Sequence, residues 1–259
     1  MRSLMIGCGN MGSSLLQRWT DLDAAQFTVV DPVSDFTHPK VRRFKTADDL
    51  GNEKFDLLIV AVKPQLIDAI IPEYLDHLEK SGTVVSIAAG YSSARLQTLT
   101  DGQPVIRIMP NMPASVGKGM SGLFATPDVL DGHLTHVTAL MEATGDVVQV
   151  DNEDYLDRVT AVAGSGPGYV FEIARAYAEA ATELGFDADT AKRLVLGTLS
   201  GAIEMALATG DDLDALRNSV TSKAGTTEAG LNALNGDGGL TDRFRATTQA
   251  AYDRAVELR

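Results

Sequence analysis

The stretch "MIGCGNMG", residues 5–12, carries three glycines in the spacing G-x-G-x-x-G. It follows an apolar run at residues 4–6 and opens a helical pattern. In a strand–turn–helix of this kind, Gly7 permits the tight turn and Gly9 lets the backbone approach a pyrophosphate, while Gly12 lets the helix pack close to the strand. The stretch therefore predicts a dinucleotide-binding loop. The alternative is a glycine-rich turn that binds no ligand.

Two neighbouring features favour the dinucleotide loop. The first N–H groups of the helix, near Asn10 and Met11, would face the phosphates with the positive end of the helix dipole behind them. A second strand at residues 27–30 ends at Asp31, about 20 residues after the glycines, where an acid accepts a hydrogen bond from the adenosine ribose. A carboxylate there would repel a ribose 2′-phosphate, which taken alone favours NADH. We expect NADPH or NADH as the cofactor, and the alternative for Asp31 is a surface side chain.

Short apolar runs continue along the first half of the chain and are separated by helical patterns, at residues 57–62, 84–87 and 105–108. Strands that alternate with helices form a parallel sheet, and such sheets bind ligands beyond the carboxyl ends of their strands. The segments "VAVKPQ", "SIAAG" and "RIMPNMP" would lie at that edge. We therefore expect further cofactor contacts from Ala61, Val62, Lys63, Ala89 and Gly90.

The second half of the chain has a different character. Eight of the nine prolines fall at or before Pro127, and proline interrupts helices. Residues 169–184 and 190–207 show the spacing of helices, and the second of these is apolar on more than one face. Such a helix is typical of the centre of a bundle or of a subunit interface. We predict a Rossmann-type doubly wound sheet over residues 1–151 and an all-helical domain for substrate binding and dimerisation over residues 152–259.

Composition excludes several classes of function. The formal charge of −13 argues against nucleic acid, because phosphate backbones are bound by Lys and Arg. The sequence contains no apolar run of the roughly 20 residues that a membrane span needs, so we expect a cytoplasmic protein without membrane contact. Cys8 is the single cysteine, so no cysteine metal cluster can form within one chain and no metal is expected. The four histidines show no ligand spacing and are expected at the surface or in loops.

Two stretches of the second half suggest binding. "AGSGPGY", residues 163–169, places Gly and Pro inside a helical pattern, which indicates either a kink or the close approach of a ligand or of the first domain. "VTSKAGTTEAGL", residues 220–231, places small and hydroxylated residues before a helix. Backbone N–H groups at such a helix start suit an anion such as a carboxylate. The alternative is a well-capped helix with no ligand.

Taken in order, "GCGNMG", "VKPQ", "RIMPNMP", "AGSGPGY" and "TSKAGTTEAGL" resemble the pyrroline-5-carboxylate reductase family over the whole chain. The resemblance implies hydride transfer from NAD(P)H to the C=N bond of 1-pyrroline-5-carboxylate, which gives L-proline in proline biosynthesis. It also implies an interwoven homodimer, with further assembly of dimers open, in which the helical domain of a neighbouring subunit completes the active site.

The resemblance also assigns roles to residues of the second half. The substrate carboxylate would be held by the N–H groups of Gly225 and Thr226 and by the Ser222 hydroxyl. Thr227 matches the family's substrate-contacting threonine and would hydrogen-bond the ring nitrogen as the catalytic residue. Glu153 matches an acid before the long helix and would support the substrate site.

Three departures from the family pattern bear on this assignment. The chain has Lys223 and Ala224 where members usually have Pro-Gly, Met112 where they have Thr, and Gly168 where they have Ala. Two alternatives are therefore kept. One is another Rossmann-plus-helical reductase of a related imine or hydroxy acid, although the lysine of the β-hydroxyacid dehydrogenases is missing from residues 155–184. The other is a catalytically silent dinucleotide sensor.

Overall fold

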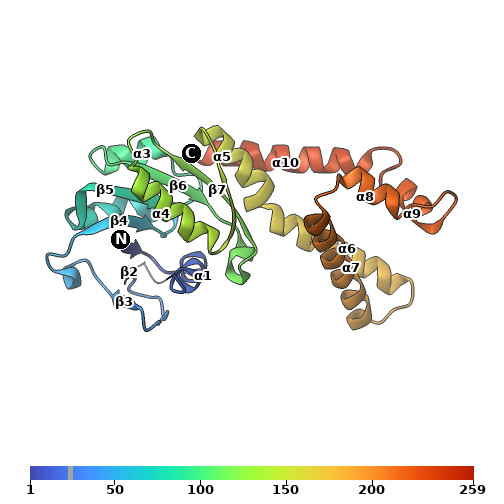
Figure 1. Cartoon of the computed structure of the whole chain (residues 1–259), viewed down its shortest axis with the longest axis horizontal. Helices are drawn as coiled ribbons and strands as arrows, with labels where there is room; N and C mark the ends of the chain where they lie inside the picture. The colour runs from blue at the N-terminus through green and yellow to red at the C-terminus, as the bar shows by residue number, and fades with distance from the viewer. Residues whose placement is uncertain (23–25) are drawn as a thin grey trace. The chain divides into compact units, whose positions relative to one another are not determined.

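A computed structural model describes residues 1–22 and 26–259 of the chain. These residues form two compact units. The sheet unit consists of Met1–Ser165 together with Ala251–Arg259, and the helical unit is Gly166–Ala250 (Figure 1). The predicted fold class, an N-terminal doubly wound sheet followed by an all-helical part, is confirmed.

Within the described residues, the sheet unit is built on one eight-stranded sheet in the order β3-β2-β1-β4-β5-β6-β7-β8. Neighbouring strands are parallel, except for the antiparallel pair β6 and β7. The strand order changes direction at β1, where Met5 lies opposite Val29 of β2 on one side and Ile59 of β4 on the other. This is the position at which such sheets bind their ligands. The strands are β1 (Arg2–Ile6), β2 (Gln26–Val30), β3 (Val41–Phe44), β4 (Phe55–Val60), β5 (Leu78–Ser86), β6 (Val105–Met109), β7 (Gly119–Ala125) and β8 (Gly145–Gln149).

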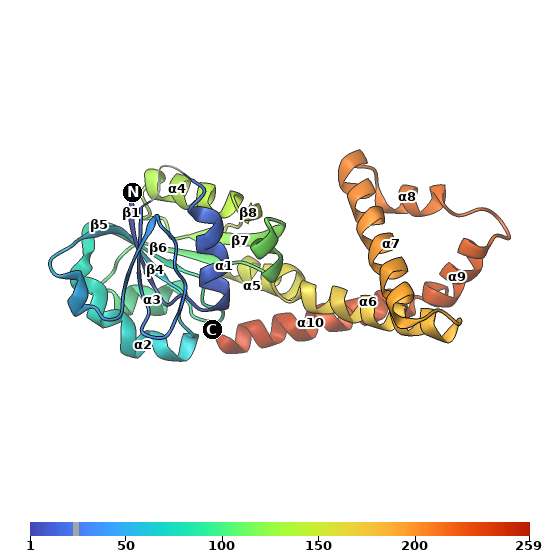
Figure 2. The same ribbon diagram turned by 90° about the horizontal axis from the view of Figure 1, so that it is seen from below.

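Helices cover both faces of the sheet, as Figure 2 shows. Side chains alternate between the two faces of a strand, so Met5 packs with Trp19 of α1 (Asn10–Trp19), whereas Leu4 and Ile6 pack with Leu96 of α3 (Ser93–Leu99). On the first face α4 (Asp131–Glu142) lies beside α1, and on the second α2 (Ile67–Ile70) lies beside α3. Both apolar clusters are buried. This packing holds the strands in place, and with them the loops that follow the strand ends.

One helix of the second half of the chain and the end of another belong to the sheet unit. The helix α5 (Glu153–Val159) packs on β7 so closely that a methyl group added to Gly122 would lie 2.8 Å from Leu156 and 2.9 Å from Val159. The end of α10 (Gly239–Leu258) lies beside α5 (Figure 1). The compact units therefore divide after Ser165, later than the predicted domain boundary after residue 151.

The helical unit has almost no apolar core of its own. Large apolar side chains are exposed on it, including Phe171 at 67%, Ile203 at 60% and Leu207 at 80%. The helices are α6 (Gly166–Glu183), α7 (Ala188–Thr209), α8 (Leu213–Ser219), α9 (Thr226–Asn235) and the first part of α10. Its buried apolar residues are Ala174, Ala181, Ala191 and Val195. Monomeric proteins rarely expose apolar surface on this scale, so this surface has the character of an interface.

Some elements differ from the sequence-based expectations. The strand β3, "VRRF", contains two arginines, and β7 is rich in glycine, so neither has the apolar pattern by which strands are recognised. The expectation that all histidines lie at the surface or in loops was wrong for His133, which is buried on α4 and hydrogen-bonds Thr83 at 2.8 Å. In the described part of the chain, no helix combines the length and the apolar character that crossing a membrane requires.

Candidate active site

The three glycines of the first loop occupy three different environments. Gly7 has φ +86°, and a methyl group on it would lie 2.8 Å from Val62 Cγ1 and 2.9 Å from the Ala61 carbonyl oxygen. A methyl group on Gly12 would touch Ala61 at 3.4 Å, whereas one on Gly9 would meet nothing within 4 Å. Gly7 therefore makes the turn, Gly12 allows α1 to pack on the strands, and the space beside Gly9 is open.

The start of α1 fits a pyrophosphate. Gly9 is the residue before the helix, and no side chain caps the helix start. The first N–H groups of a helix have no partner within it, so those of Asn10 and Met11 point outward with the helix dipole behind them. The first turn carries no acidic residue that would repel an anion. The open space beside Gly9 thus adjoins unpaired donors of the kind that bind phosphate.

Asp31 holds the glycine loop to the end of β2. Its Oδ2 accepts a hydrogen bond from the Cys8 N–H at 2.6 Å, and its Oδ1 accepts from the N–H groups of Val33 and Ser34, each at 2.8 Å. Burial alone would raise the pKa of Asp31, but these backbone donors lower it below its ordinary value. The carboxylate is therefore ionised and fixed beside the loop. Sequence reasoning placed Asp31 at this edge but missed its hydrogen bond to the loop, and its contact with a ribose stays a prediction.

The other predicted cofactor residues lie at the carboxyl ends of β4 and β5. Ala61 and Val62 are half-buried and pack around Gly7, whereas Lys63 is exposed. Ala89 is exposed in the loop after β5, and Gly90 follows it with φ +70°. The sheet topology therefore brings the residues predicted after β1, β2, β4 and β5 to one edge of the sheet unit.

Glu153 fastens the loop after β5 to α5. Its Oε1 accepts from the Ser93 N–H at 2.9 Å and from Arg107 at 2.6 Å, and its Oε2 accepts from the Ser93 hydroxyl at 2.9 Å. Arg107 is 4% exposed. Burial alone would raise the pKa of Glu153, but the hydrogen bonds from Arg107 and Ser93 lower it. Both carboxylate oxygens have protein partners, so Glu153 supports this loop; its predicted role toward a substrate remains untested.

The "AGSGPGY" stretch approaches the sheet. Residues Thr160–Gly164 form a π-helical turn between α5 and α6, a feature that is frequent at functional sites. Asn111, in the loop after β6, donates to the Ala163 carbonyl at 2.9 Å and accepts from the Met120 N–H at 3.0 Å. A methyl group on Gly164 would lie 2.7 Å from the end of Met109. Close approach to the first domain therefore explains the small residues at 163–164, and Asn111 is a contact that sequence reasoning missed.

The predicted substrate residues gather in one loop of the helical unit. Gly225 immediately precedes α9, and its N–H donates to the Ser222 carbonyl at 3.0 Å. A methyl group on Gly225 would lie 2.3 Å from the Ser222 hydroxyl oxygen, so a side chain at residue 225 would displace that hydroxyl. Ser222, Thr226 and Thr227 are exposed at the helix start. The loop therefore presents hydroxyl groups and the free N–H groups of a helix N-terminus.

The departure at residues 223 and 224 has a structural counterpart. Ala224 has φ +59°, a region that favours glycine. Its N–H donates to a carboxylate oxygen of Glu228 at 2.7 Å. The loop thus keeps a left-handed residue where the resemblance places glycine, and Glu228, one turn into α9, secures it. The sequence signal for Glu228 was its position three residues after the residue that precedes the helix.

Comparison with known proteins gives two matching family models. Residues 153–258 match the model described as pyrroline-5-carboxylate reductase dimerisation, and residues 4–90 match the one described as NADP oxidoreductase coenzyme F420-dependent. The chain is 35% identical to the pyrroline-5-carboxylate reductase of Pseudomonas aeruginosa, over 99% of this chain and 96% of that protein.

Solved structures show the same likeness. A pyrroline-5-carboxylate reductase from Coxiella burnetii matches with a TM-score of 0.91 and 33% identity, over 99% of this chain and 97% of that one. The pyrroline carboxylate reductase of Plasmodium falciparum, solved with NADP bound, matches with a TM-score of 0.87 over 100% of this chain and 98% of that one. Its 22% identity makes it a likeness of fold alone.

The environments of the glycines predict different effects of an added methyl group. Gly9→Ala should fold as the wild type does, because the methyl group meets no protein atom, but it should weaken dinucleotide binding at least about tenfold by entering the pyrophosphate space. Gly7→Ala should instead lower the melting temperature, because it strains φ and contacts the Ala61 backbone. Thermal denaturation and fluorescence titration with NADH and NADPH measure both effects. Unchanged binding by folded Gly9→Ala would contradict the assignment of the loop.

The Glu153 cluster predicts a dependence of stability on pH. Because the pKa of Glu153 is lowered in the folded state, its stabilisation is fully present above the ordinary value of 4.5 and is lost as the pH falls through the folded-state pKa. Glu153→Gln should cost about 2–3 kcal/mol at pH 7, and its difference from the wild type should shrink below pH 4.5. Urea denaturation across this range measures the difference in unfolding free energy.

The matched control is Glu79→Gln, which removes an exposed partner of Arg2 at 3.4 Å. It should cost less than about 1 kcal/mol. Equal losses in the two variants, or a Glu153→Gln difference that is constant with pH, would contradict the assigned role of the cluster.

Proposed function

Because this chain belongs to the pyrroline-5-carboxylate reductase family, we propose that it reduces the C=N bond of 1-pyrroline-5-carboxylate to give L-proline. The observation that carries the proposal is the 35% identity to such an enzyme over 99% of the chain. The geometry of the glycine loop supports it, because open space and free N–H groups adjoin each other at the ligand-binding edge of the sheet. The chain is thus an NAD(P)-dependent oxidoreductase that acts on an imine.

A reduced nicotinamide dinucleotide supplies the hydride when it is bound. The N–H groups at Asn10 and Met11 would hold its pyrophosphate beside Gly9. Asp31, kept ionised by its backbone donors, would accept from the adenosine ribose and repel a 2′-phosphate. Taken alone, this carboxylate would favour NADH, whereas the family model that matches residues 4–90 is described as an NADP oxidoreductase. The proposed cofactor is therefore NADPH or NADH.

The loop before α9 would bind the substrate. The Thr226 N–H and the Ser222 hydroxyl would hold the carboxylate, because a helix start carries free donors and a positive dipole end. The Gly225 N–H, expected to join them, donates to the Ser222 carbonyl at 3.0 Å and would have to exchange that partner for the substrate. Lys223, exposed beside them, adds a positive charge that is compatible with an anionic ring. The function of this loop is to orient the imino acid, and orientation alone contributes much of the rate of such reactions.

Thr227 would hydrogen-bond the ring nitrogen. A threonine hydroxyl is a poor acid at neutral pH, so it would polarise the C=N bond or relay a proton through water. The charge on that nitrogen changes during reduction, and a partner fixed at the atom where charge develops lowers the barrier most. Thr227 stands in the first turn of α9, which keeps its side chain on a regular scaffold.

A second copy of the chain would complete the site. The helical unit exposes apolar side chains on α6 and α7, and the matching family model for this region is described as dimerisation. We infer an interwoven homodimer in which the loop of residues 222–227 of one copy serves the sheet unit of the other. Further assembly of dimers is compatible with this arrangement.

Replacing Thr227 tests the proposed mechanism. Thr227→Ala should lower turnover of 1-pyrroline-5-carboxylate about 10²–10³-fold, the range for loss of a donor at a developing charge, and leave dinucleotide binding unchanged. Thr227→Ser keeps the hydroxyl and should retain most of the activity. The assay follows NADH or NADPH absorbance. Unchanged turnover by Thr227→Ala would remove Thr227 from the mechanism, and dinucleotide binding by the wild type without any turnover would favour a silent sensor.

A further inference from the structure

The loop after β5, residues 87–92, rests on the end of α10. A methyl group on Gly90 would lie 2.6 Å from Leu258 Cβ and 2.8 Å from the Leu258 carbonyl oxygen. The two backbones are thus in direct contact, and a side chain at residue 90 would push them apart. Gly90 also has φ +70°. Glycine restricts its own backbone angles less than other residues do. The position of this loop therefore depends on the end of α10, against which it packs.

Two acids of α5 hold the end of α10 in place. Asp157 is 2% exposed and pairs with the Arg259 guanidinium at 3.0 Å. Asp154, three residues earlier on the same helix, accepts from the Tyr252 hydroxyl at 2.5 Å. Burial raises the pKa of Asp157, and the positive charges of Arg259 and Arg107 oppose that rise. The pKa of Asp157 stays raised on balance, so the ion pair offsets only part of the cost of burying this carboxylate. It joins α5 to the residue next to Leu258.

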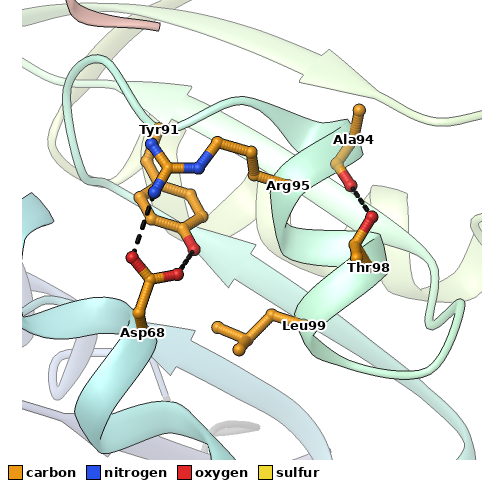
Figure 3. Close-up of a pocket in the computed structure, with 6 residues that line it drawn as sticks. All are labelled: Asp68, Tyr91, Ala94, Arg95, Thr98 and Leu99. Carbon is orange, nitrogen blue, oxygen red and sulfur yellow. Dashed lines mark hydrogen bonds and ion pairs between the residues drawn. The ribbon is translucent and has the colours of Figure 1, made fainter.

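The other side of the loop is anchored by buried Tyr91. Its hydroxyl donates to Asp68 at 2.5 Å, and Arg95, which lies over its ring at 4.2 Å, pairs with the second oxygen of Asp68 at 3.0 Å. Figure 3 shows the guanidinium over the ring and Asp68 facing both groups. These residues line an open surface cavity of about 470 Å³. The side chain of Tyr91 is held by Asp68, and that of Ser93, just after the loop, is held by Glu153. Gly90 has no side chain, and its backbone packs against Leu258.

We propose that Arg259 and Asp157 are positioning residues of the reductase: their ion pair seats Leu258 against Gly90 and so sets where the loop of residues 87–92 lies against the nicotinamide ring. The inference rests on the proposed function, because it takes Ala89 and Gly90 as nicotinamide contacts. Neither Arg259 nor Asp157 touches the reacting atoms. Their effect passes through the backbone contact between residues 258 and 90.

The consequence for catalysis is geometric. Hydride transfer needs the donor and acceptor atoms at close contact, and a displacement of about 1 Å can cost up to about 100-fold in rate. Most dinucleotide contacts lie elsewhere, at the glycine loop and Asp31. Loss of the ion pair should therefore lower turnover far more than it lowers cofactor affinity.

The test replaces Arg259 and compares it with an arginine in the last turns of α10, the helix that Arg259 follows. Arg259→Met should lower kcat about tenfold, with the Kd for the preferred reduced dinucleotide changed less than about threefold. Arg259→Lys keeps the charge and should recover most of the loss. The control is Arg254→Met, which removes an exposed pair with Glu257 at 2.8 Å and should leave kcat and Kd unchanged. Amide hydrogen exchange of peptides covering residues 87–92 should be faster in Arg259→Met only.

The outcomes separate the role of the ion pair from general destabilisation. If Arg259→Met does not fold, Asp157→Asn, which removes the other charge of the ion pair and keeps the size of the side chain, should show the same loss of kcat. Wild-type kcat and wild-type exchange in folded Arg259→Met would overturn the proposal, and so would an equal loss in Arg254→Met. If the wild type does not reduce 1-pyrroline-5-carboxylate, the proposed function fails. The exchange measurement still decides whether Arg259 positions the loop.

Discussion

The helical unit cannot bury its own apolar side chains, and the rest of the account depends on that constraint. Its buried apolar residues are three alanines and Val195, whereas Phe171 and Leu207 are 67% and 80% exposed. A unit of this size gains little stability from so small a core. A second copy that covers α6 and α7 would supply the missing burial. The loop of residues 222–227 belongs to this unit, so assembly and substrate binding would depend on the same part of the chain.

The sheet unit, in contrast, has two buried apolar clusters and brings its functional loops to one edge. Gly7 and Gly12 are required by close contacts with the end of β4, and Asp31 ties the loop to β2 through the Cys8 N–H. In the part of the sheet that contains β4 and β5, Glu153 holds the end of the loop after β5 through Ser93. The dinucleotide loops are thus held by buried or ionised groups before any ligand arrives, so little ordering would remain to oppose binding.

The sequence predicted the fold class, because glycine spacing and apolar runs are local signals, and the comparison with known proteins confirmed the family. It did not predict β3 or β7, whose arginines and glycines obscure the strand pattern, or the burial of His133 on α4. The contacts of Asp31, Asn111, Glu228 and Arg259 were also missed. Each joins residues whose proximity only the folded chain creates, except Glu228, whose position in the first turn of α9 was a usable signal. The roles of Ser222, Thr226 and Thr227 toward a substrate stay predictions.

The most direct measurement of the central claim is complementation between two inactive subunits. One variant, Gly9→Val, blocks the pyrophosphate space but keeps the substrate loop intact. The other, Thr227→Ala, impairs the substrate loop but keeps the dinucleotide loop intact. After the two are unfolded, mixed in equal amounts and refolded together, half of the sites in each mixed dimer should be intact, and activity should recover to about a quarter of wild type for random pairing in a twofold dimer. Activity no greater than the mean of the separately refolded variants would contradict a site built from two copies.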